Sequence, residues 1–412
     1  MASSDLSSTS PARLALQHFT SQWFLIPQGT GITAVILHQL DYQFRGLQIV
    51  SYVFWIMTIV LLLCMVLVYI VRCIRFPRQL AGALRHDIGE LACLTSIVIS
   101  FTSIIQMTSL VLVPGRGSSK GWGVAVYVLW WINAALATVG AIGVPFVFVR
   151  LYPGGIPHLS PASQLPLIAA LTAAAGGGTL CQSAGLSAAL QVPVIVVSYL
   201  LVGMGLPLAF ALDVLFWARL LDRSLPNRQH VYQDMILCGP WGQGSFALQG
   251  LGAAVLRGSF ASYARSTFIT AEAAKPVGYV SIFAGLLAWG TGTFWWIFAI
   301  VSILHAATDH WRFRVLPFDL STWAVVFPWG VYTNAAVQLG KLLDSAAFKV
   351  WSTALAVMLV AIWLLNMVLT IRGVVTGSLF GLEHGWRSGA AHGGKQDAER
   401  GEARPRTGKV KQ

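Results

Sequence analysis

Long apolar runs alternate with short polar connections along most of this chain. A helix needs about 20 apolar residues to cross the hydrocarbon core of a bilayer. Ten segments approach or exceed that length: 22–40, 49–71, 91–113, 122–149, 165–189, 193–218, 236–256, 279–306, 319–340 and 350–371. The pattern predicts an all-α, polytopic membrane protein with ten transmembrane helices in residues 21–375. A short N-terminal segment, residues 1–20, and a tail, residues 376–412, flank this domain.

Charge supports these boundaries and predicts an orientation. The chain is 56% hydrophobic and 10% charged, which is less than half the charged share of a soluble domain. All 27 Lys and Arg residues fall outside the ten segments. The connections on the side of both termini hold 19 of them and the other side holds 8. Because Lys and Arg favour the cytoplasmic side, both termini are predicted to be cytoplasmic, and the basic, glycine-rich tail is predicted to be disordered.

Small and polar residues recur at helical spacing in the odd-numbered segments. In 165–189 they fall at steps of three or four residues, which places them on one helical face. The polar positions of the first, third, fifth and seventh segments include Gln28, Thr30, Thr33, Ser96, Ser100, Ser103, Thr172, Gly176, Thr179, Ser183, Ser187, Gly242, Ser245, Gln249 and Gly252. Small residues also permit close helix packing. Because the pattern recurs in alternate segments, we favour a shared central pore lined by the odd helices.

The ninth segment has the clearest polar face. Phe327, Asn334 and Gln338 follow one another at steps of seven and four residues, so that one face carries an aromatic ring followed by two amides. Pro328 cannot donate a backbone hydrogen bond and is expected to kink the helix beside Phe327.

A glycine-rich stretch, LCGPWGQGSFALQGLG, occupies residues 237–252. Glycine disfavours a helix by about 1 kcal/mol, and irregular backbone inside a membrane is tolerated where it lines a water-filled cavity. Free N–H groups of a broken helix also suit an anion. The stretch therefore predicts irregular, pore-lining backbone, and its candidate anion-binding residues are Gly242, Gln243, Gly244, Ser245 and Gln249.

Other chemistries find little support in the sequence. No nucleotide-binding or catalytic motif occurs, so we expect neither an enzyme nor a bound cofactor. His305, Asp309 and His310 are better explained as a hydrated helix end than as metal ligands. The basic residues form no patch for nucleic acid. Asp213 is the one carboxylate well inside an apolar segment, which makes it a candidate proton carrier or a paired structural acid.

Five segments carry a family resemblance: PQGTGITAVIL (27–37), RFPRQLAGALRH (75–86), GVPFVF (143–148), ILCGPWGQGSFALQGLG (236–252) and WAVVFPWGVYTNA (323–335). They resemble the tellurite-resistance/dicarboxylate transporter family, and GPWGQGSF is most similar to its fungal sulfite efflux pumps. The resemblance implies five helical hairpins with quasi-fivefold symmetry, the odd helices inside, one pore per protomer and a homotrimer. Phe327 matches the position of a pore-blocking Phe, and Gln28, Gly29, Thr30 and Gly31 join the candidate anion-binding residues. Gln28 and Trp241 depart from the residues usual in the fungal members.

The functional hypothesis is export of sulfite or hydrogensulfite across a plasma membrane. A dicarboxylate carrier for malate is the alternative within the same family, although a dianion would be expected to need an Arg in the pore. A membrane sensor whose polar core is only a packing interface is a third hypothesis.

Overall fold

The computed structural model describes residues 10–113, 119–152, 155–156, 159–223, 231–263, 266–309, 312–313, 316–382 and 386. The chain divides into two compact units. The smaller consists of the two ends of the chain, up to Phe19 and from Leu369, and the larger is Thr20–Val368. In the smaller unit α1 (Pro11–Gln17) packs against the 3₁₀ helix η7 (Ser378–Phe380). Residues 387–412, most of the tail predicted to be disordered, lie outside the described residues.

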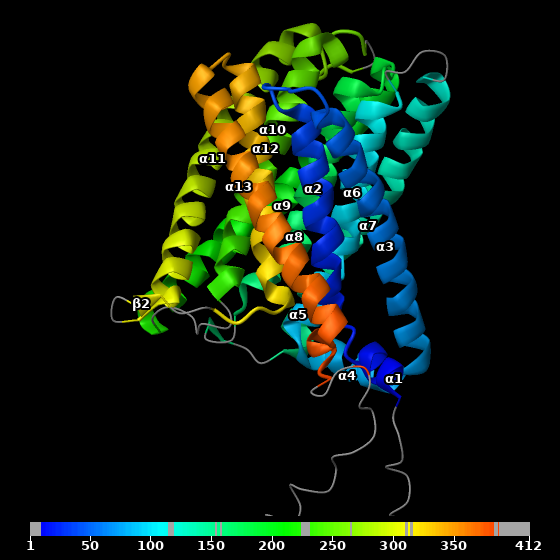
Figure 1. Cartoon of the computed structure of the whole chain (residues 1–412). Helices are drawn as coiled ribbons and strands as arrows, with labels where there is room; N and C mark the ends of the chain where they lie inside the picture. Colours follow the sequence, from blue (N-terminus) through cyan, green and yellow to red (C-terminus); the bar gives the residue numbers. More distant parts are fainter. Residues whose placement is uncertain are drawn as a thin grey trace, which may run out of the picture. The chain divides into compact units, whose positions relative to one another are not determined.

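The larger unit is helical, and each of the ten predicted segments contains a helix (Figure 1). Its elements are η1 (Ser21–Phe24), α2 (Leu25–Gln39), α3 (Leu47–Arg75), α4 (Pro77–His86), α5 (Ile88–Cys93), α6 (Thr95–Val111), α7 (Ser119–Leu151), η3 (Pro161–Gln164), α8 (Leu165–Ser183), α9 (Ala188–Arg223), η4 (Val231–Cys238), α10 (Gly239–Ala254), the π-helix η5 (Val255–Ser259), α11 (Ala271–Ala307), β1 (Thr308–Asp309), β2 (Arg312–Phe313), η6 (Leu320–Val325), α12 (Val326–Leu342) and α13 (Ala346–Thr376), which continues into the smaller unit. β1 and β2 pair antiparallel.

Seven helical stretches of the described residues are long and apolar enough to span a membrane. They are Leu47–Arg75, Ile88–Val111, Gly121–Leu151, Pro161–Ser183, Ala188–Asp222, Ala271–Ala307 and Ala346–Thr376. The other three predicted segments form the shorter helices α2, α10 and α12, of 15, 16 and 17 residues. These three are almost wholly buried, so the surrounding helices rather than lipid provide their environment.

Five helices form a closed ring. α2 packs against α6, α6 against α8, α8 against α10, α10 against α12, and α12 against α2. α3, α7, α9 and α11 each contact two neighbouring members of the ring from outside. The most apolar window of α8 is 100% buried, whereas that of α7 is 22% buried. The alternation predicted from the sequence, odd segments inside and even segments outside, is therefore the observed arrangement of these helices.

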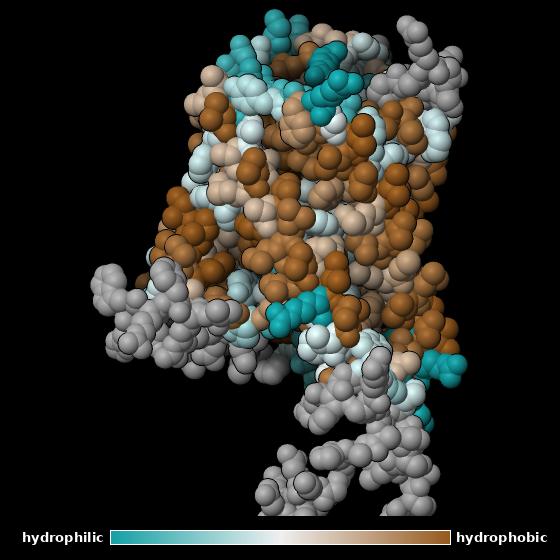
Figure 2. Space-filling view, viewed as in Figure 1, coloured by the Kyte–Doolittle hydropathy of each residue, from teal (hydrophilic) through white to brown (hydrophobic). Residues whose placement is uncertain are grey.

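The outer helices turn large apolar side chains outward. Ile56, Leu63 and Ile74 on α3 are 57%, 59% and 72% exposed, and hydrophobic residues cover most of the visible helical surface between the ends of the helices (Figure 2). An exposed apolar surface of this extent is expected where lipid rather than water surrounds the protein.

Glycines lie at every contact around the ring. A Cβ atom added at Gly31 of α2 would lie 2.7 Å from the Cβ atom of Ser103 on α6. The corresponding close approaches are Gly176 to Thr102, Gly178 to the backbone of Gly250, Gly242 to the backbone of Tyr332, and Gly330 to Ile32. Such distances leave no room for a larger side chain. The glycines therefore allow the five helices to approach closely enough to close the ring.

Four of the ring helices begin in the same way. A 3₁₀ turn precedes each of α2, α8, α10 and α12, and each has a proline in its first turn, namely Pro27, Pro166, Pro240 and Pro328. The expected kink at Pro328 is therefore wrong, because the α-helix starts at Val326. A first-turn residue has no intrahelical partner for its N–H group, so proline is tolerated there.

Two further expectations need correction. The glycine-rich stretch does not break its helix, since α10 runs without interruption from Gly239 to Ala254. The predicted polar stripe of the fifth segment ends one step early: α8 stops at Ser183, Gly185 has a left-handed φ of +59°, and Ser187 precedes α9. Glycine is the residue best suited to that turn between the two helices.

Candidate functional site: the inner face of the helix ring

The inner face of α12 carries the residues predicted from its spacing. Trp329 donates a hydrogen bond from Nε1 to the carbonyl of Leu355 on α13 (3.1 Å), and the ring of Tyr332 stacks on Trp289 of α11 at 4.9 Å. These two residues mark the outer side of α12. Phe327, Asn334 and Gln338 lie on the opposite side by helical geometry, so they face the interior of the ring.

Helical geometry also places Gln28 and Gln243 on the inward sides of their helices. Thr30 of α2 accepts a hydrogen bond from Nε1 of Trp363 on α13 (3.0 Å), which marks the outer side of α2. Trp241 of α10 donates to Asp213 on α9 (2.6 Å), which marks the outer side of α10. Gln28 and Gln243 project from the other sides of their helices, and both are 1% exposed.

These inward amides hold polar atoms that pair with no other group in the part of the chain that the structure describes. The Oε1 atoms of Gln28 and Gln243 and both amide atoms of Asn334 are buried without a hydrogen-bond partner among the described residues. Buried polar groups are usually paired, and each exception needs an explanation. Since the oxygen and nitrogen of an amide are assigned from hydrogen bonding, either can meet a polar ligand. The inner face therefore presents buried amide atoms whose hydrogen-bonding capacity is not used by the described residues.

Other predicted polar residues are occupied within the protein. Thr30 and Ser100 donate hydrogen bonds to carbonyls one turn earlier in their own helices. Thr179 does the same and also accepts a bond from Nε2 of Gln106 on α6 (3.1 Å). Such back-bonding satisfies a buried hydroxyl locally. The donor hydrogen of each of these three hydroxyls is therefore used within its own helix.

The predicted residues of the seventh segment have two roles: some pack or bond against neighbouring helices, and one faces the interior of the ring. Ser245 donates to the carbonyl of Gly285 on α11 (2.6 Å), and Gln249 donates to Ser245 (2.7 Å). Gly242 and Gly244 pack against Tyr332 and Leu206. These contacts tie α10 to its neighbours, and Gln243 is the member of the predicted set that faces inward.

In the first segment the two predicted glycines are also packing positions. A Cβ atom at Gly29 would lie 2.8 Å from Cγ1 of Val326 on α12, whereas Gly31 faces α6. Gly29 and Gly31 together allow α2 to contact α12 and α6. Gln28 projects inward between these two neighbouring helices.

Asp213 is paired on both carboxylate oxygens. Oδ1 accepts a hydrogen bond from Nε2 of Gln164 (2.5 Å) and Oδ2 accepts one from Nε1 of Trp241 (2.6 Å), and the residue is 4% exposed. The network connects η3, α9 and α10. It also gives Trp241 a physical role, because no smaller apolar residue could donate this bond.

Replacing Trp241 by Phe is expected to destabilise the folded protein by about 1–3 kcal/mol, because a buried carboxylate oxygen then loses its donor. Thermal unfolding of the purified protein in detergent measures the effect. Trp122→Phe is the matched control, since Trp122 is 41% exposed. Equal unfolding temperatures for the two variants would show that the indole hydrogen bond contributes little.

A buried charge cluster around Glu90 was not predicted from the sequence. Glu90 is 1% exposed and accepts hydrogen bonds from Nη1 of Arg72 (2.5 Å), the Tyr69 hydroxyl (3.1 Å) and the backbone N–H of Ser21 (2.9 Å). The cluster joins η1, which precedes the first ring helix, to α3 and α5. In the sequence, Arg72 looks like any basic residue that follows an apolar segment. Its burial could therefore not be predicted.

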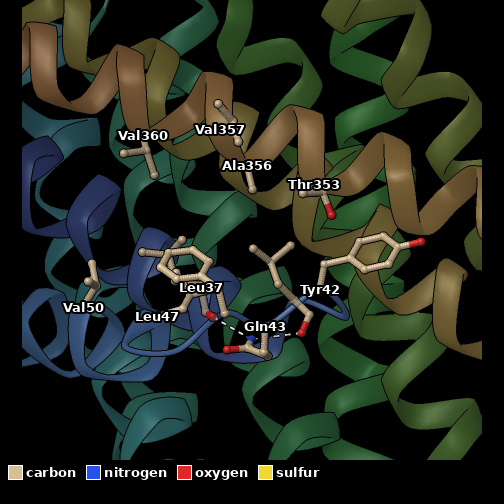
Figure 3. Close-up of a pocket in the computed structure, with 11 residues that line it drawn as sticks. Leu37, Tyr42, Gln43, Leu47, Val50, Thr353, Ala356, Val357 and Val360 are labelled. Carbon is tan, nitrogen blue, oxygen red and sulfur yellow. Dashed lines mark hydrogen bonds between the residues drawn. The ribbon is translucent and has the colours of Figure 1, made fainter.

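An apolar pocket lies away from the inner face. It measures about 540 Å³ and is lined by Leu37, Leu40, Tyr42, Gln43, Phe44, Leu47, Val50, Thr353, Ala356, Val357 and Val360 (Figure 3). The amide of Gln43 already donates to the carbonyls of Leu37 (3.1 Å) and Leu40 (3.0 Å). Because apolar side chains dominate the lining, this pocket does not suit a small oxyanion.

The metal motif considered from the sequence lies partly outside the described residues. His305 lies in the last turn of α11, but the side chain of Asp309 and all of His310 lie outside the described residues. Among the residues that were described, no group of three or more His, Cys, Asp or Glu side chains forms a candidate metal site.

Comparison with known proteins places this geometry in context. The model of the SLAC1 family, described as voltage-dependent anion channels, matches residues 18–371. A sulfite efflux pump of Arthroderma benhamiae is 29% identical over 370 residues, covering 89% of this chain and 94% of the relative. A malic acid transport protein of Schizosaccharomyces pombe is 24% identical over 373 residues, covering 90% and 81%. An uncharacterized transporter of Methanocaldococcus jannaschii is 23% identical over 366 residues, covering 89% and 97%.

Proposed function

Because the chain belongs to the SLAC1 family of voltage-dependent anion channels, it is a membrane anion transporter, and we propose that it exports sulfite or hydrogensulfite through the ring of α2, α6, α8, α10 and α12. The inward amides with unpartnered atoms on Gln28, Gln243 and Asn334 carry this proposal. The similarity to sulfite efflux pumps supports the choice of substrate.

A neutral polar lining suits an ion that must cross quickly. No Lys, Arg, Asp or Glu occurs in α2, α6, α8 or α10, and α12 holds only Lys341, near its C-terminal end. Complete dehydration of an anion costs tens of kcal/mol in the Born limit. Amide N–H groups and water replace part of the hydration shell without binding as tightly as a fixed positive charge. A site of this strength favours passage over retention.

The proposed topology follows the sequence prediction. All ten segments would cross the plasma membrane as five hairpins with quasi-fivefold symmetry about the pore, with both termini in the cytoplasm and three protomers in a complex. The closed ring and the repeated 3₁₀ turn and proline at four helix starts support the quasi-fivefold symmetry of this arrangement. The inside-negative potential would drive anions outward by about 2.3 kcal/mol per charge per 100 mV.

Purified protein in liposomes is expected to give sulfite flux that falls when Gln243 is replaced by Leu, because an inward amide is lost while the side-chain volume is nearly kept. Gln182→Leu is the control, since the Gln182 amide is bonded to the carbonyl of Gly250 (2.9 Å) rather than unpartnered. Flux that is equal in both variants would remove the inward amides from the pathway.

The same assay separates the remaining hypotheses. Stronger flux of malate than of sulfite would favour the dicarboxylate alternative, which the malic acid transport protein among the relatives supports. Absence of any anion flux would favour a sensor. Proton coupling through Asp213 predicts that Asp213→Asn abolishes the response of flux to a pH gradient, whereas a paired structural acid predicts lower stability with the response unchanged.

A further inference from the structure

A short basic helix follows directly on a lipid-facing one. The outward side chains of α3 remain apolar to its end, where Leu67 is 62% exposed and Ile74 is 72% exposed. α4 then begins at Pro77 and packs against α3 and α5. Since apolar side chains of this size are exposed where acyl chains surround the protein, α4 starts at the level where hydrocarbon gives way to lipid headgroups.

α4 has two distinct faces. Leu80 is buried, and the carbonyl of Leu84 accepts a hydrogen bond from the hydroxyl of Tyr152, which directly follows α7 (3.0 Å). These contacts fix one side of α4 on the protein. Arg78 and Arg85 lie seven residues apart on the other side, about two turns along the helix axis, and both are exposed.

Space between the two arginines is open. Gly82 lies one turn after Arg78 on the same face, and a Cβ atom added there would meet no atom within 4 Å. Arg78 and Arg85, about 10 Å apart along the helix axis, and the bare backbone at Gly82 between them therefore form an outward-facing cradle.

The positive charge of this face is uncompensated by the described part of the chain. Arg75, Arg78 and Arg85 form no ion pair with any carboxylate among the described residues. The neighbouring acid, Asp87, accepts a hydrogen bond from the backbone N–H of Gly89 (2.8 Å). Three unpaired guanidinium groups at a membrane boundary are complementary to phosphate, because Arg binds phosphate in a bidentate fork.

We propose that α4 binds the headgroup of an anionic phospholipid, with the phosphate between Arg78 and Arg85 and the acyl chains along the exposed apolar side chains of α3. The adjoining apolar surface at Ile74 favours a lipid over a free phosphate ion, since it offers contact to the acyl chains as well as to the headgroup. This site lies outside the helix ring and is independent of the proposed substrate.

Native mass spectrometry of the full-length protein with added phosphatidylglycerol or phosphatidylcholine tests the proposal. Arg78→Gln combined with Arg85→Gln is expected to weaken phosphatidylglycerol binding about 25-fold, about fivefold for each charge removed, and to leave phosphatidylcholine binding unchanged. Arg45→Gln is the matched control, because Arg45 is exposed just before the opposite end of α3. Equal phosphatidylglycerol binding by wild-type and double-variant protein would overturn the proposal.

A second variant guards against misfolding of the first. Gly82→Glu places a carboxylate in the open space between the arginines and is expected to weaken phosphatidylglycerol binding at least as strongly as the loss of one arginine. Unchanged binding in this variant would contradict the cradle. Displacement of phosphatidylglycerol by millimolar inorganic phosphate would show a free-phosphate site instead of a lipid site.

Discussion

Phe327→Ala is expected to raise anion conductance per folded protein about tenfold, which corresponds to lowering the barrier by about 1.4 kcal/mol. Phe327 is 1% exposed and lies on the inward side of α12, one residue before Pro328 in the first turn. Removing its ring widens the passage without removing an amide, since Asn334 and Gln338 lie farther along the same face. Selectivity among anions should broaden for the same reason.

The competing explanation makes Phe327 a packing residue only. Truncation would then cost about 3–5 kcal/mol of stability and lower the amount of folded protein without raising conductance. Conductance in liposomes, normalised to protein recovered from size-exclusion chromatography, distinguishes the two. Phe216→Ala is a matched control, because Phe216 is also 1% exposed but lies on the outer helix α9. A conductance increase in both variants, or in neither, would remove Phe327 from the gate.

Gly242→Val is expected to lower flux at least tenfold. A Cβ atom at Gly242 would lie 2.7 Å from the backbone nitrogen of Tyr332 and 3.0 Å from the carbonyl carbon of Val331. Backbone cannot move aside as a flexible side chain can, so α10 and α12 must separate. Overpacking of this kind typically costs 1–3 kcal/mol, and the displacement shifts both Gln243 and Phe327, which project into the same interior.

Gly290→Val provides the matched control for that variant. Gly290 also lies in a long helix, α11, but an added Cβ atom would meet nothing within 4 Å. Flux should therefore remain near the wild-type value, and the two proteins can be compared in one liposome assay. Retained flux in the Gly242 variant would show that the α10–α12 contact does not need its close approach.

The helical segments and their inside–outside alternation could be predicted from the sequence. Apolar length fixed the position of every major helix, because a backbone inside a bilayer must satisfy its hydrogen bonds within a helix. Spacing of small and polar residues separated the buried helices from the lipid-facing ones. On α12 the same spacing placed Phe327, Asn334 and Gln338 on one face, and the contacts of Trp329 and Tyr332 agree with that assignment.

The structural role of the glycines could be assigned only from the tertiary structure. In sequence, the stretch around Gly242 is compatible with irregular backbone, yet α10 is regular and its glycines meet α9, α11 and α12. The propensity cost of a glycine is about 1 kcal/mol, which tertiary packing outweighs. The role of the prolines also required the tertiary structure. A proline in the middle of a helix kinks it, whereas Pro328 lies in the first turn of α12, where proline is tolerated.

Hydrogen bonds and ion pairs between residues far apart in the chain could also not be predicted from the sequence. Trp241 was visible only as a departure from a family pattern, and Arg72 only as one basic residue among many. The structure joins Trp241 to Asp213, 28 residues away, and Arg72 to Glu90, 18 residues away. By itself the sequence determined which segments enter the membrane and which faces are polar, because these depend on local composition and helical period. Only the tertiary structure decided which polar atoms are satisfied by partners and which remain unpartnered inside the ring, because that depends on contacts between helices.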